Sequence, residues 1–286
     1  MYLAGVRYRV TGAEAIVRKG LKGIDPADTE GFGGRDDVAD ELKRLQASIR
    51  DLHAQLFAEG RRSLLIVLQG MDTSGKDGAV RSIFTALNPH AAHAWAFKAP
   101  TAEELAHDFL WRIHARVPAK GEIAIFNRSH YEDVVAVRVR GLVPDDVWRR
   151  RYEAINAFEQ LLVDSGTSVL KLFLHISKDE QKKRLERRLA DPSKHWKFDP
   201  GDIRERARWD AYMQAYDEAF ENCSPSHAPW HIVPADRKWY RDLAVARAVE
   251  AALKAIDPRF PDRSVELADV RIIDAPLVPS ELPTKG

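Results

Sequence analysis

The feature that most constrains the fold is an apolar run, SLLIVLQ at residues 63–69, that leads straight into the glycine-rich stretch GMDTSGKDG. A short apolar run followed by glycine is typical of a strand that is buried on both faces of a parallel sheet. The following residues, 76–87, have a helical pattern that ends at Asn88-Pro89. This order predicts a loop at the carboxyl end of a parallel strand, where α/β proteins bind ligands.

Four further apolar runs alternate with helical patterns along the chain. These runs are residues 92–98, 122–126, 168–176 and 230–233. The predicted helices cover about 36–60, 76–87, 101–115, a segment that starts at 129, 145–165, a segment that starts at 177, 202–221 and 238–256. Three of them open with a capping-box pattern, at Thr101–Glu104, Ser129–Glu132 and Ser177–Glu180. Strands that alternate with helices predict an α/β fold with a five-stranded parallel sheet and helices on both faces.

The composition agrees with one globular domain that has terminal arms. The chain has 286 residues, of which 45% are hydrophobic and 30% are charged. We predict an N-terminal arm at residues 1–35, a main domain at 36–256 and a C-terminal tail at 257–286. The single cysteine, Cys223, cannot form an internal disulfide and is expected to be a core residue. No apolar run approaches the ~20 residues that span a bilayer, so a cytoplasmic location without a membrane partner is expected.

The glycine-rich stretch has the G-x-x-x-x-G-K spacing of a loop that binds phosphate. Its small residues let successive backbone N–H groups point at one anion, at the positive end of the next helix. Lys76 adds a positive charge for the phosphate that is transferred. The residues predicted to bind phosphate or nucleotide here are Gly70, Thr73, Ser74, Gly75, Lys76, Asp77 and Gly78. The alternative is a glycine-rich turn without a ligand, but the strand before it and the helix after it favour a phosphate loop.

Two acids in this loop indicate a metal ion. A carboxylate beside a polyphosphate would repel it unless Mg²⁺ lies between them, so Asp72 is the first predicted metal ligand. Asp77 occupies the position where a Ser or Thr hydroxyl normally binds magnesium. Asp77 can serve as a ligand, or it can be a solvated acid that favours the N-terminus of the helix. The sequence leaves both roles open.

A second polar motif, residues 127–133, follows the third predicted strand. Phosphate-loop enzymes often carry a metal-organising acid at this point, but here the residue is Asn127, which has no charge. Arg128 can stabilise charge on a transferring phosphoryl group. Glu132 and Asp133 lie one helical turn further on and are predicted to supply the missing negative charge, although the capping box alone explains Glu132.

The third feature is a basic run, QKKRLERRLADPSKHWKF at residues 181–198. A charged run on a helix is usually a solvated face. This run, however, follows the fourth strand and ends in a connector with proline and aromatic residues, where nucleotide kinases carry a mobile lid that brings arginines over the phosphates. We therefore favour a lid at about 181–201. The predicted phosphate-binding residues of the lid are Arg187, Arg188, Lys194 and Lys197, and those elsewhere are Lys98, Arg112 and Arg138.

Taken together, these stretches resemble the polyphosphate kinase 2 family, and most of all its class III members, which phosphorylate AMP and ADP with inorganic polyphosphate. The likeness runs through residues 36–262 and rests on LLIVLQGMDTSGKDG, HDFLWRIH, FNRSHYEDV, INAFE, FLHISKDEQKKRL, DPSKHWKF and HAPWHIVPADRKWY. The resemblance implies a thymidylate-kinase-like P-loop kinase domain, dependence on Mg²⁺ (with Mn²⁺ as an alternative) and assembly into a homo-oligomer, a dimer or a tetramer. It places Asp72 and Lys76 in the Walker A motif. Asn127 and Arg128 fall at the Walker B position, where many relatives have Asp instead of Asn.

The predicted function is the Mg²⁺-dependent, reversible transfer of a terminal phosphoryl group from inorganic polyphosphate to AMP and ADP. The predicted catalytic residues are Asp72, Lys76, Asn127, Arg128, Arg187 and Arg188, and the predicted metal ligands are Asp72, Glu132 and Asp133. Clusters of Lys and Arg would bind polyphosphate by the counterion release known for nucleic acids, but a net charge of +1 gives no overall reason to expect a nucleic-acid partner. Two alternatives stay open: an ATP-dependent kinase for a nucleoside monophosphate or another small molecule, and a non-catalytic nucleotide-binding switch.

Overall fold

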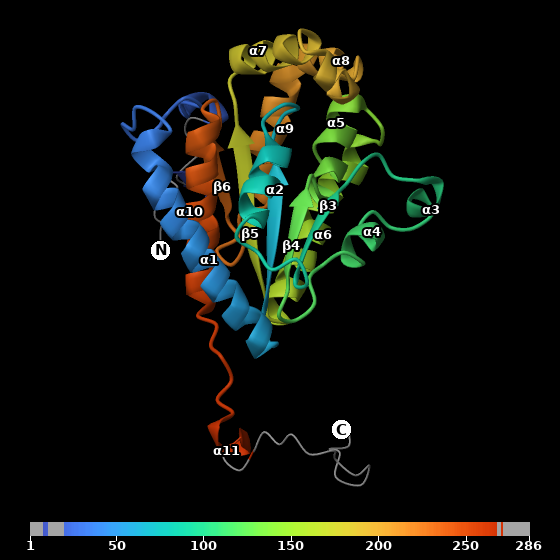
Figure 1. The fold of residues 1–286 in the computed structure, drawn as a ribbon. Helices are drawn as coiled ribbons and strands as arrows, with labels where there is room; N and C mark the ends of the chain where they lie inside the picture. The colour runs from blue at the N-terminus through green and yellow to red at the C-terminus, as the bar shows by residue number, and fades with distance from the viewer. Residues whose placement is uncertain (1–7, 11–19, 268–269, 271–286) are drawn as a thin grey trace.

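The computed structural model describes residues 8–10, 20–267 and 270. Within these residues, one six-stranded sheet has the strand order β1-β6-β5-β2-β4-β3 (Figure 1). Five of its strands are parallel: β2 (Ser63–Gln69), β3 (Ala92–Ala96), β4 (Ile123–Asn127), β5 (Thr167–His175) and β6 (Trp230–Pro234). The predicted five-stranded parallel sheet is therefore confirmed.

The sixth strand, β1 (Tyr8–Val10), is absent from the sequence prediction. It pairs antiparallel with β6, with Tyr8 opposite Ile232. Three residues are too few for a period-2 pattern, so only the partner strand identifies this segment. The described residues that follow it also contact the main domain: the Asp236 N–H donates a hydrogen bond to the Pro26 carbonyl at 3.0 Å.

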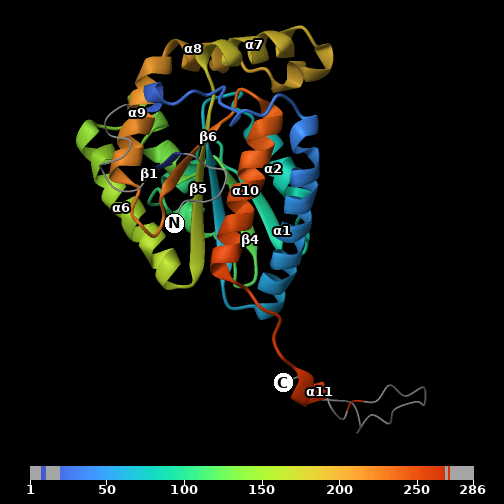
Figure 2. The ribbon, with the colours of Figure 1, turned by 90° about the vertical axis from the view of Figure 1, so that its left-hand side faces the viewer.

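Helices cover both faces of the sheet (Figures 1 and 2). One face carries α1 (Ala39–Glu59), α2 (Lys76–Phe84) and α10 (Lys238–Ile256), and the other carries α5 (Ala136–Arg140), α6 (Asp145–Asp164) and α9 (Trp209–Asn222). At the carboxyl end of the strands, α7 (Lys178–Leu189) and α8 (Gly201–Ala207) form a layer across the top of the molecule. The short elements are η1 (Leu21–Gly23), η2 (Asp36–Val38), α3 (Ala102–Leu105), α4 (Trp111–His114), η3 (His130–Asp133), η4 (Pro192–Lys197) and α11 (Ser264–Leu267). Among the helices of the described part, none has both the length and the apolar character needed to cross a membrane.

Two predicted helices are broken in the structure. The segment 101–115 forms α3 and α4, and between them Asp108 Oδ1 accepts a hydrogen bond from the Leu110 N–H at 2.9 Å. This local side-chain bond competes with a continuous helix. The segment 202–221 is likewise divided at Arg208 into α8 and α9.

The three predicted capping boxes differ in the hydrogen bonds that they form in the structure. Thr101 and Glu104 form the complete box, and Ser177 Oγ accepts from the Glu180 N–H at 3.0 Å. At the third pattern, Ser129 Oγ accepts from the Tyr131 N–H instead, and a 3₁₀ turn, η3, replaces the predicted helix start. The predicted box between Ser129 and Glu132 is therefore wrong, and capping does not explain Glu132.

A buried charge cluster lies beneath η3. Lys171, in the middle of β5, and Glu159 of α6 are fully buried and joined by an ion pair of 2.5 Å. The Lys171 ammonium also donates to the Tyr131 hydroxyl and to the carbonyl of Cys223, each at 2.8 Å. The Cys223 side chain is buried, as expected, and burial raises the pKa of its thiol to about 12.

Candidate active site

The loop between β2 and α2 has an unusual backbone. Gly70 has φ of 148°, Gly75 has φ of 102° and Thr73, which is not glycine, has φ of 65°. A Cβ atom at Gly70 would lie 2.7 Å from the Leu174 carbonyl oxygen, so only glycine fits there. A left-handed Thr is strained by about 1–3 kcal/mol. The loop therefore has a fixed shape that its surroundings must hold.

Lys76 is buried at the start of α2. Its ammonium donates to the carbonyl oxygens of Gly70 at 2.7 Å and Met71 at 3.2 Å. Burial, together with the charge of nearby Arg128, lowers the pKa of Lys76 to about 8, against the opposing effect of the Asp72 carboxylate. A bound phosphate would supply the negative charge that this ammonium lacks.

Two hydroxyl groups in the loop have no partner. Thr73 Oγ1 and Ser74 Oγ are buried and make no hydrogen bond within the described residues. Buried polar groups in proteins are almost always satisfied. These two hydroxyls, next to Lys76, are therefore suited to donate to the oxygens of a bound phosphate.

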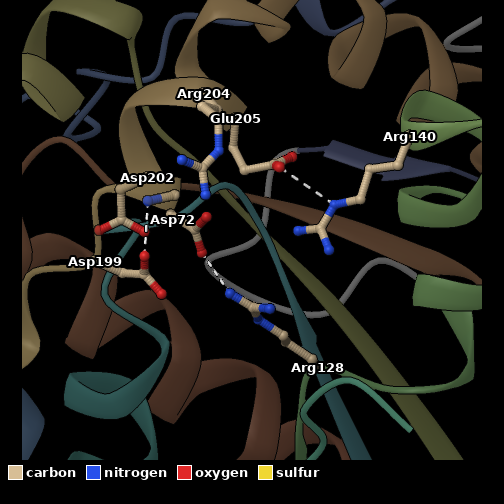
Figure 3. A pocket seen from close by; sticks show the side chains of 8 residues that line it. Asp72, Arg128, Arg140, Asp199, Asp202, Arg204 and Glu205 are labelled. Carbon is tan, nitrogen blue, oxygen red and sulfur yellow. Dashed lines mark hydrogen bonds and ion pairs between the residues drawn. The ribbon is translucent and has the colours of Figure 1, made fainter.

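Arg128 faces the loop from the end of β4 (Figure 3). Its Nη2 lies 2.5 Å from Asp72 Oδ1, and its backbone is left-handed, with φ of 63°. Burial alone would lower the pKa of Arg128, but the carboxylates of Glu132 and Asp72 outweigh it and raise the pKa. The structure thus brings together Asp72, Lys76 and Arg128, which the sequence predicts to act in catalysis.

The Walker B position and the loop meet through an amide and an acid. Asn127 Nδ2 donates to Asp77 Oδ1 at 2.8 Å. The negative charge that Asn127 lacks is therefore present on its neighbour across the site. Glu132 lies close by: with its amide oriented to satisfy both groups, Gln69 donates to Glu132 Oε1 at 3.1 Å and accepts from Ser129.

A pocket of about 300 Å³ opens between the loop and α8 (Figure 3). Its lining residues are Asp72, Arg128, Arg140, Asp199, Gly201, Asp202, Arg204 and Glu205. Only two of these, Asp72 and Arg128, are among the predicted site residues. The mixture of acids and arginines suits a ligand that carries phosphate together with a cation.

The carboxyl group of Asp202, in α8, has a pKa well above its ordinary value. Burial, together with the charge of Asp72, raises the pKa of Asp202 to about 6. Arg188, a predicted lid residue, forms an ion pair with it at 3.4 Å. Near neutral pH, Asp202 therefore adds a negative charge at the pocket wall, which a bound polyanion would meet.

Two of the other predicted lid residues contact acids outside the pocket lining. Arg187 is 60% exposed and pairs with Glu180 at 3.2 Å, while Lys194 forms an ion pair with Asp191 in its own turn. The side chain of Lys197 lies outside the described part of the chain. Their predicted contacts with phosphate stay predictions.

Arg138 lies on α5 away from the pocket. It donates to Glu218 of α9 at 2.6 Å and stacks 4.7 Å above the Trp148 ring. Arg140, two residues further on, instead reaches the pocket and pairs with Glu205 at 3.2 Å. Residues two apart on a helix face nearly opposite sides, which explains why only one of the two arginines lines the pocket.

Lys98, Arg112 and Asp133 gather beside the ends of β3 and β4. Arg112 Nη1 donates to the Lys98 carbonyl at 2.8 Å, and its Nη2 lies 3.8 Å from Asp133 Oδ2. Arg151 Nη1 lies 3.4 Å from the other oxygen of Asp133. Burial raises the pKa of Asp133, and Arg112 and Arg151 oppose this effect. The carboxylate predicted to bind metal is thus held between two arginines.

The residues of the loop fit a magnesium ion that arrives with phosphate. In the described part of the chain, no group of three or more His, Cys, Asp and Glu side chains is arranged to hold a metal by itself. Mg²⁺ in phosphoryl-transfer sites usually takes one or two carboxylates and completes its shell with phosphate oxygens and water. Asp72, whose side chain is 21% exposed at the pocket, and Asp77 offer carboxylates of this kind.

Comparison with known proteins identifies the family. A model of the polyphosphate kinase 2 (PPK2) family matches residues 34–261. The chain belongs to this family. It is 47% identical over 242 residues to an AMP/ADP-polyphosphate phosphotransferase of Meiothermus ruber, with 84% of this chain and 91% of that protein covered. It is 39% identical to an ADP-polyphosphate phosphotransferase of Rhodopseudomonas palustris, with 81% and 86% covered.

Solved structures agree with this assignment. The crystal structure of polyphosphate kinase 2 from Arthrobacter aurescens TC1 superposes with a TM-score of 0.83 and 47% sequence identity, covering 88% of this chain and 89% of that one. The predicted P-loop kinase fold and the resemblance drawn from the sequence are therefore confirmed.

Proposed function

We propose that this chain is a polyphosphate-dependent nucleotide kinase that transfers a terminal phosphoryl group from inorganic polyphosphate to AMP and ADP, reversibly. The observation that carries the proposal is the phosphate loop, where Lys76 is buried, two hydroxyls have no hydrogen-bond partner and Asp72 pairs with Arg128. The names of the relatives in Meiothermus and Rhodopseudomonas support the choice of donor and acceptor.

The roles follow from charge and position. Phosphoryl transfer requires alignment and stabilisation of charge more than covalent chemistry by the protein. Lys76, the loop N–H groups and the hydroxyls of Thr73 and Ser74 would hold the phosphate being transferred. Arg128, now paired with Asp72 at 2.5 Å, can turn to a phosphate oxygen when the substrate provides a competing anion. Lid arginines such as Arg188 would neutralise further charge.

Magnesium would be held by Asp72 and by Asp77, which lies against Asn127, with Glu132 and Asp133 as further acids near the site. A bound Mg²⁺, or Mn²⁺ in its place, would neutralise phosphate oxygens and so lower the repulsion between donor and acceptor. Without it, the carboxylates of the loop would oppose binding of a polyphosphate. This accounts for acids in a site that binds an anion.

The proposed setting is a homo-oligomer in the cytoplasm. The subunit number, the arm at 1–35, the lid at about 181–201 and the tail at 257–286 stay predictions. Polyphosphate carries roughly one charge per phosphate, so its binding by Lys and Arg would weaken steeply with salt.

The decisive experiment incubates the pure protein with AMP, Mg²⁺ and polyphosphate in the absence of ATP. We expect ADP and then ATP, and parallel reactions with ADP, GMP and GDP would define the acceptor. The Lys76→Ala variant, folded as judged by circular dichroism, serves as the control for contaminating kinases. Turnover only with ATP as donor would favour the ATP-dependent kinase, and tight nucleotide binding without turnover would favour the switch.

A further inference from the structure

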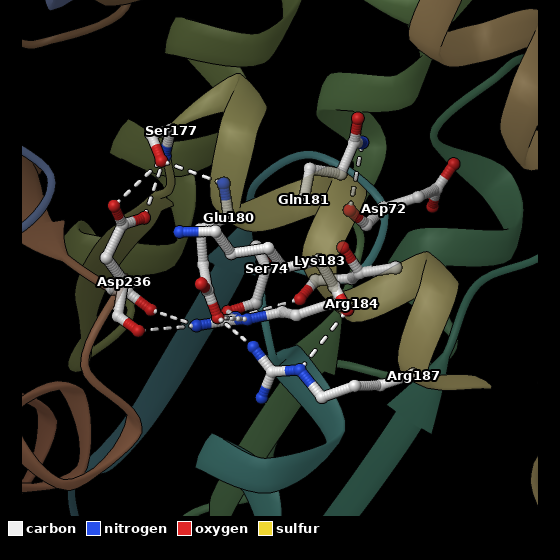
Figure 4. Close-up of polar contacts among 11 residues, drawn as sticks. Asp72, Ser74, Ser177, Glu180, Gln181, Lys183, Arg184, Arg187 and Asp236 are labelled. Carbon is white, nitrogen blue, oxygen red and sulfur yellow. Dashed lines mark hydrogen bonds and ion pairs between the residues drawn. The ribbon is translucent and has the colours of Figure 1, made fainter. Parts of the chain in front are cut away.

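One arginine of the basic run differs from its neighbours in its contacts. Arg184 of α7 is 6% exposed, and all five N–H groups of its guanidinium have acceptors within the protein (Figure 4). Nη1 donates to the carbonyls of Thr73 (2.9 Å) and Ser74 (3.0 Å), and Nε donates to Glu180 (2.8 Å). Nη2 donates to the carbonyls of Ala235 (2.6 Å) and Asp236 (2.9 Å). Arg184 therefore has no donor left for a phosphate.

These bonds orient peptide groups of the phosphate loop. A second residue of α7, Gln181, donates to the Asp72 carbonyl at 3.1 Å, so three successive loop carbonyls point toward α7. In a planar trans peptide, the N–H group points opposite to the C=O group. The N–H groups of Thr73, Ser74 and Gly75 are therefore turned away from α7. Of these, Ser74 N–H closes the turn onto Met71 O at 3.0 Å, which leaves the other two for an anion.

Arg184 also ties the first turns of α7 to the loop after β6, through its bond to the Asp236 carbonyl. Asp236, in the loop after β6, accepts hydrogen bonds from the N–H and the hydroxyl of Ser177, each at 2.8 Å. Ser177 in turn caps α7 through the Glu180 N–H. The first turns of α7 are thus tied to two loops, whereas Arg187, one turn later, is 60% exposed and bonds only within its own helix among the contacts that the structure gives it.

We propose that Arg184 is a positioning residue for phosphoryl transfer. It aims the loop N–H groups at the phosphate by holding the loop carbonyls from behind, and it anchors the base of α7 so that any lid movement begins after Arg184. The proposal explains how a loop with a left-handed Thr73 keeps its shape. The kinetic part of its test rests on the proposed function, and the binding part does not.

The test compares Arg184→Ala, Arg184→Lys and Gln181→Ala with the wild type. Arg150→Ala is the matched control, because Arg150 is 74% exposed on α6 and makes one ion pair, with Asp146. Calorimetry measures the affinity for inorganic tripolyphosphate, and steady-state kinetics separates kcat from KM for AMP. Circular dichroism restricts the comparison to folded variants, and methylguanidinium is added to Arg184→Ala to replace the missing group.

For Arg184→Ala we expect kcat to fall on the order of 10²-fold and tripolyphosphate to bind about tenfold more weakly, while KM for AMP changes less than about twofold. Methylguanidinium should restore part of kcat in Arg184→Ala and have no effect on Arg150→Ala. A lysine cannot reach four carbonyls, so Arg184→Lys should remain impaired, and Gln181→Ala should show a smaller loss in the same direction.

A folded Arg184→Lys or Arg184→Ala variant with wild-type kcat and wild-type tripolyphosphate affinity would overturn the proposal. If both Arg184 variants fail to fold, Gln181→Ala decides: unchanged affinity and kcat also overturn it. A wild-type protein that binds tripolyphosphate but transfers nothing to AMP would count against the proposed function alone, since the affinities of the variants still test Arg184.

Discussion

Binding of inorganic tripolyphosphate is expected to draw a proton onto Lys76. In the free protein, burial and the charge of Arg128 lower the pKa of this ammonium from 10.5 to about 8, which corresponds to a net penalty of about 3 kcal/mol for the charged form. A bound polyanion beside Nζ removes that penalty and returns the pKa toward its ordinary range. Lys76 should therefore take up about one tenth of a proton on binding at pH 7, about half at pH 8 and about nine tenths at pH 9.

The assay is calorimetric titration with tripolyphosphate in buffers of different ionisation enthalpy, from which the number of protons taken up is obtained. Tripolyphosphate titrates in the same range, so Lys76→Met supplies the correction: the difference between wild type and variant belongs to Lys76. The same shift affects folding. Between pH 8 and 10.5 the unfolded chain binds more protons at Lys76, so the contribution of this group to stability rises with pH in that window.

Equal proton uptake by wild type and a folded Lys76→Met at pH 8 and pH 9 would refute this reasoning. It would mean that Lys76 stays fully charged in the empty site, or that the polyanion binds elsewhere. Binding that is equally tight in the two proteins would select the second explanation.

Three further results are expected. Asp72→Asn should lower kcat at least ~10²-fold in a folded protein, since it removes the carboxylate that we propose to hold Mg²⁺, and near-normal turnover in the polyphosphate assay would reject that role. Lys171→Met leaves the buried carboxylate of Glu159 without its counter-charge, so urea unfolding should show a loss of about 3–5 kcal/mol, part of which the Lys171→Met/Glu159→Leu double variant recovers; a loss below about 1 kcal/mol would contradict this. Asn127→Asp replaces the amide whose Nδ2 lies 2.8 Å from Asp77 Oδ1 by a second carboxylate. Because the two carboxylates repel each other, the melting temperature of this variant in EDTA should be below that of the wild type, and Mg²⁺ should restore it. A variant that does not respond to Mg²⁺ would argue against a cation between these positions.

The parts of the site that the sequence predicts share one origin, the carboxyl ends of parallel strands. Asp72 and Lys76 follow β2, and Asn127 and Arg128 lie at the end of β4. The two strands are adjacent in the sheet, so chain order and strand order together bring these residues close. An apolar strand followed by glycine and polar residues is a local signal in the sequence. It predicts the structure correctly here because both faces of the sheet are buried.

What the sequence misses depends on how helices are rotated and docked. Arg184 and Arg187 are indistinguishable in the basic run, because the bonds that turn one side of α7 toward the phosphate loop, including those between Ser177 and Asp236, join residues that are distant in the sequence. Asp202 reaches the pocket because the connector after η4 folds α8 back over the loop. The two acids of the segment DPGD (199–202), directly after the basic run, were a sequence signal for this part of the pocket. The residues that they meet in the pocket, however, are distant in the sequence. The strand β1 is missed for the same reason.

The buried Cys223 has a practical consequence for observing the lid. It is the only thiol in the sequence, its side chain is buried, and its pKa of about 12 leaves almost no thiolate at neutral pH. A cysteine introduced at an exposed position of the predicted lid, such as Trp196→Cys at 78% exposure, would then be the single site that a maleimide dye or spin label attacks. The predicted closure of this segment over polyphosphate could be tested in real time from one probe, with the native thiol left in place.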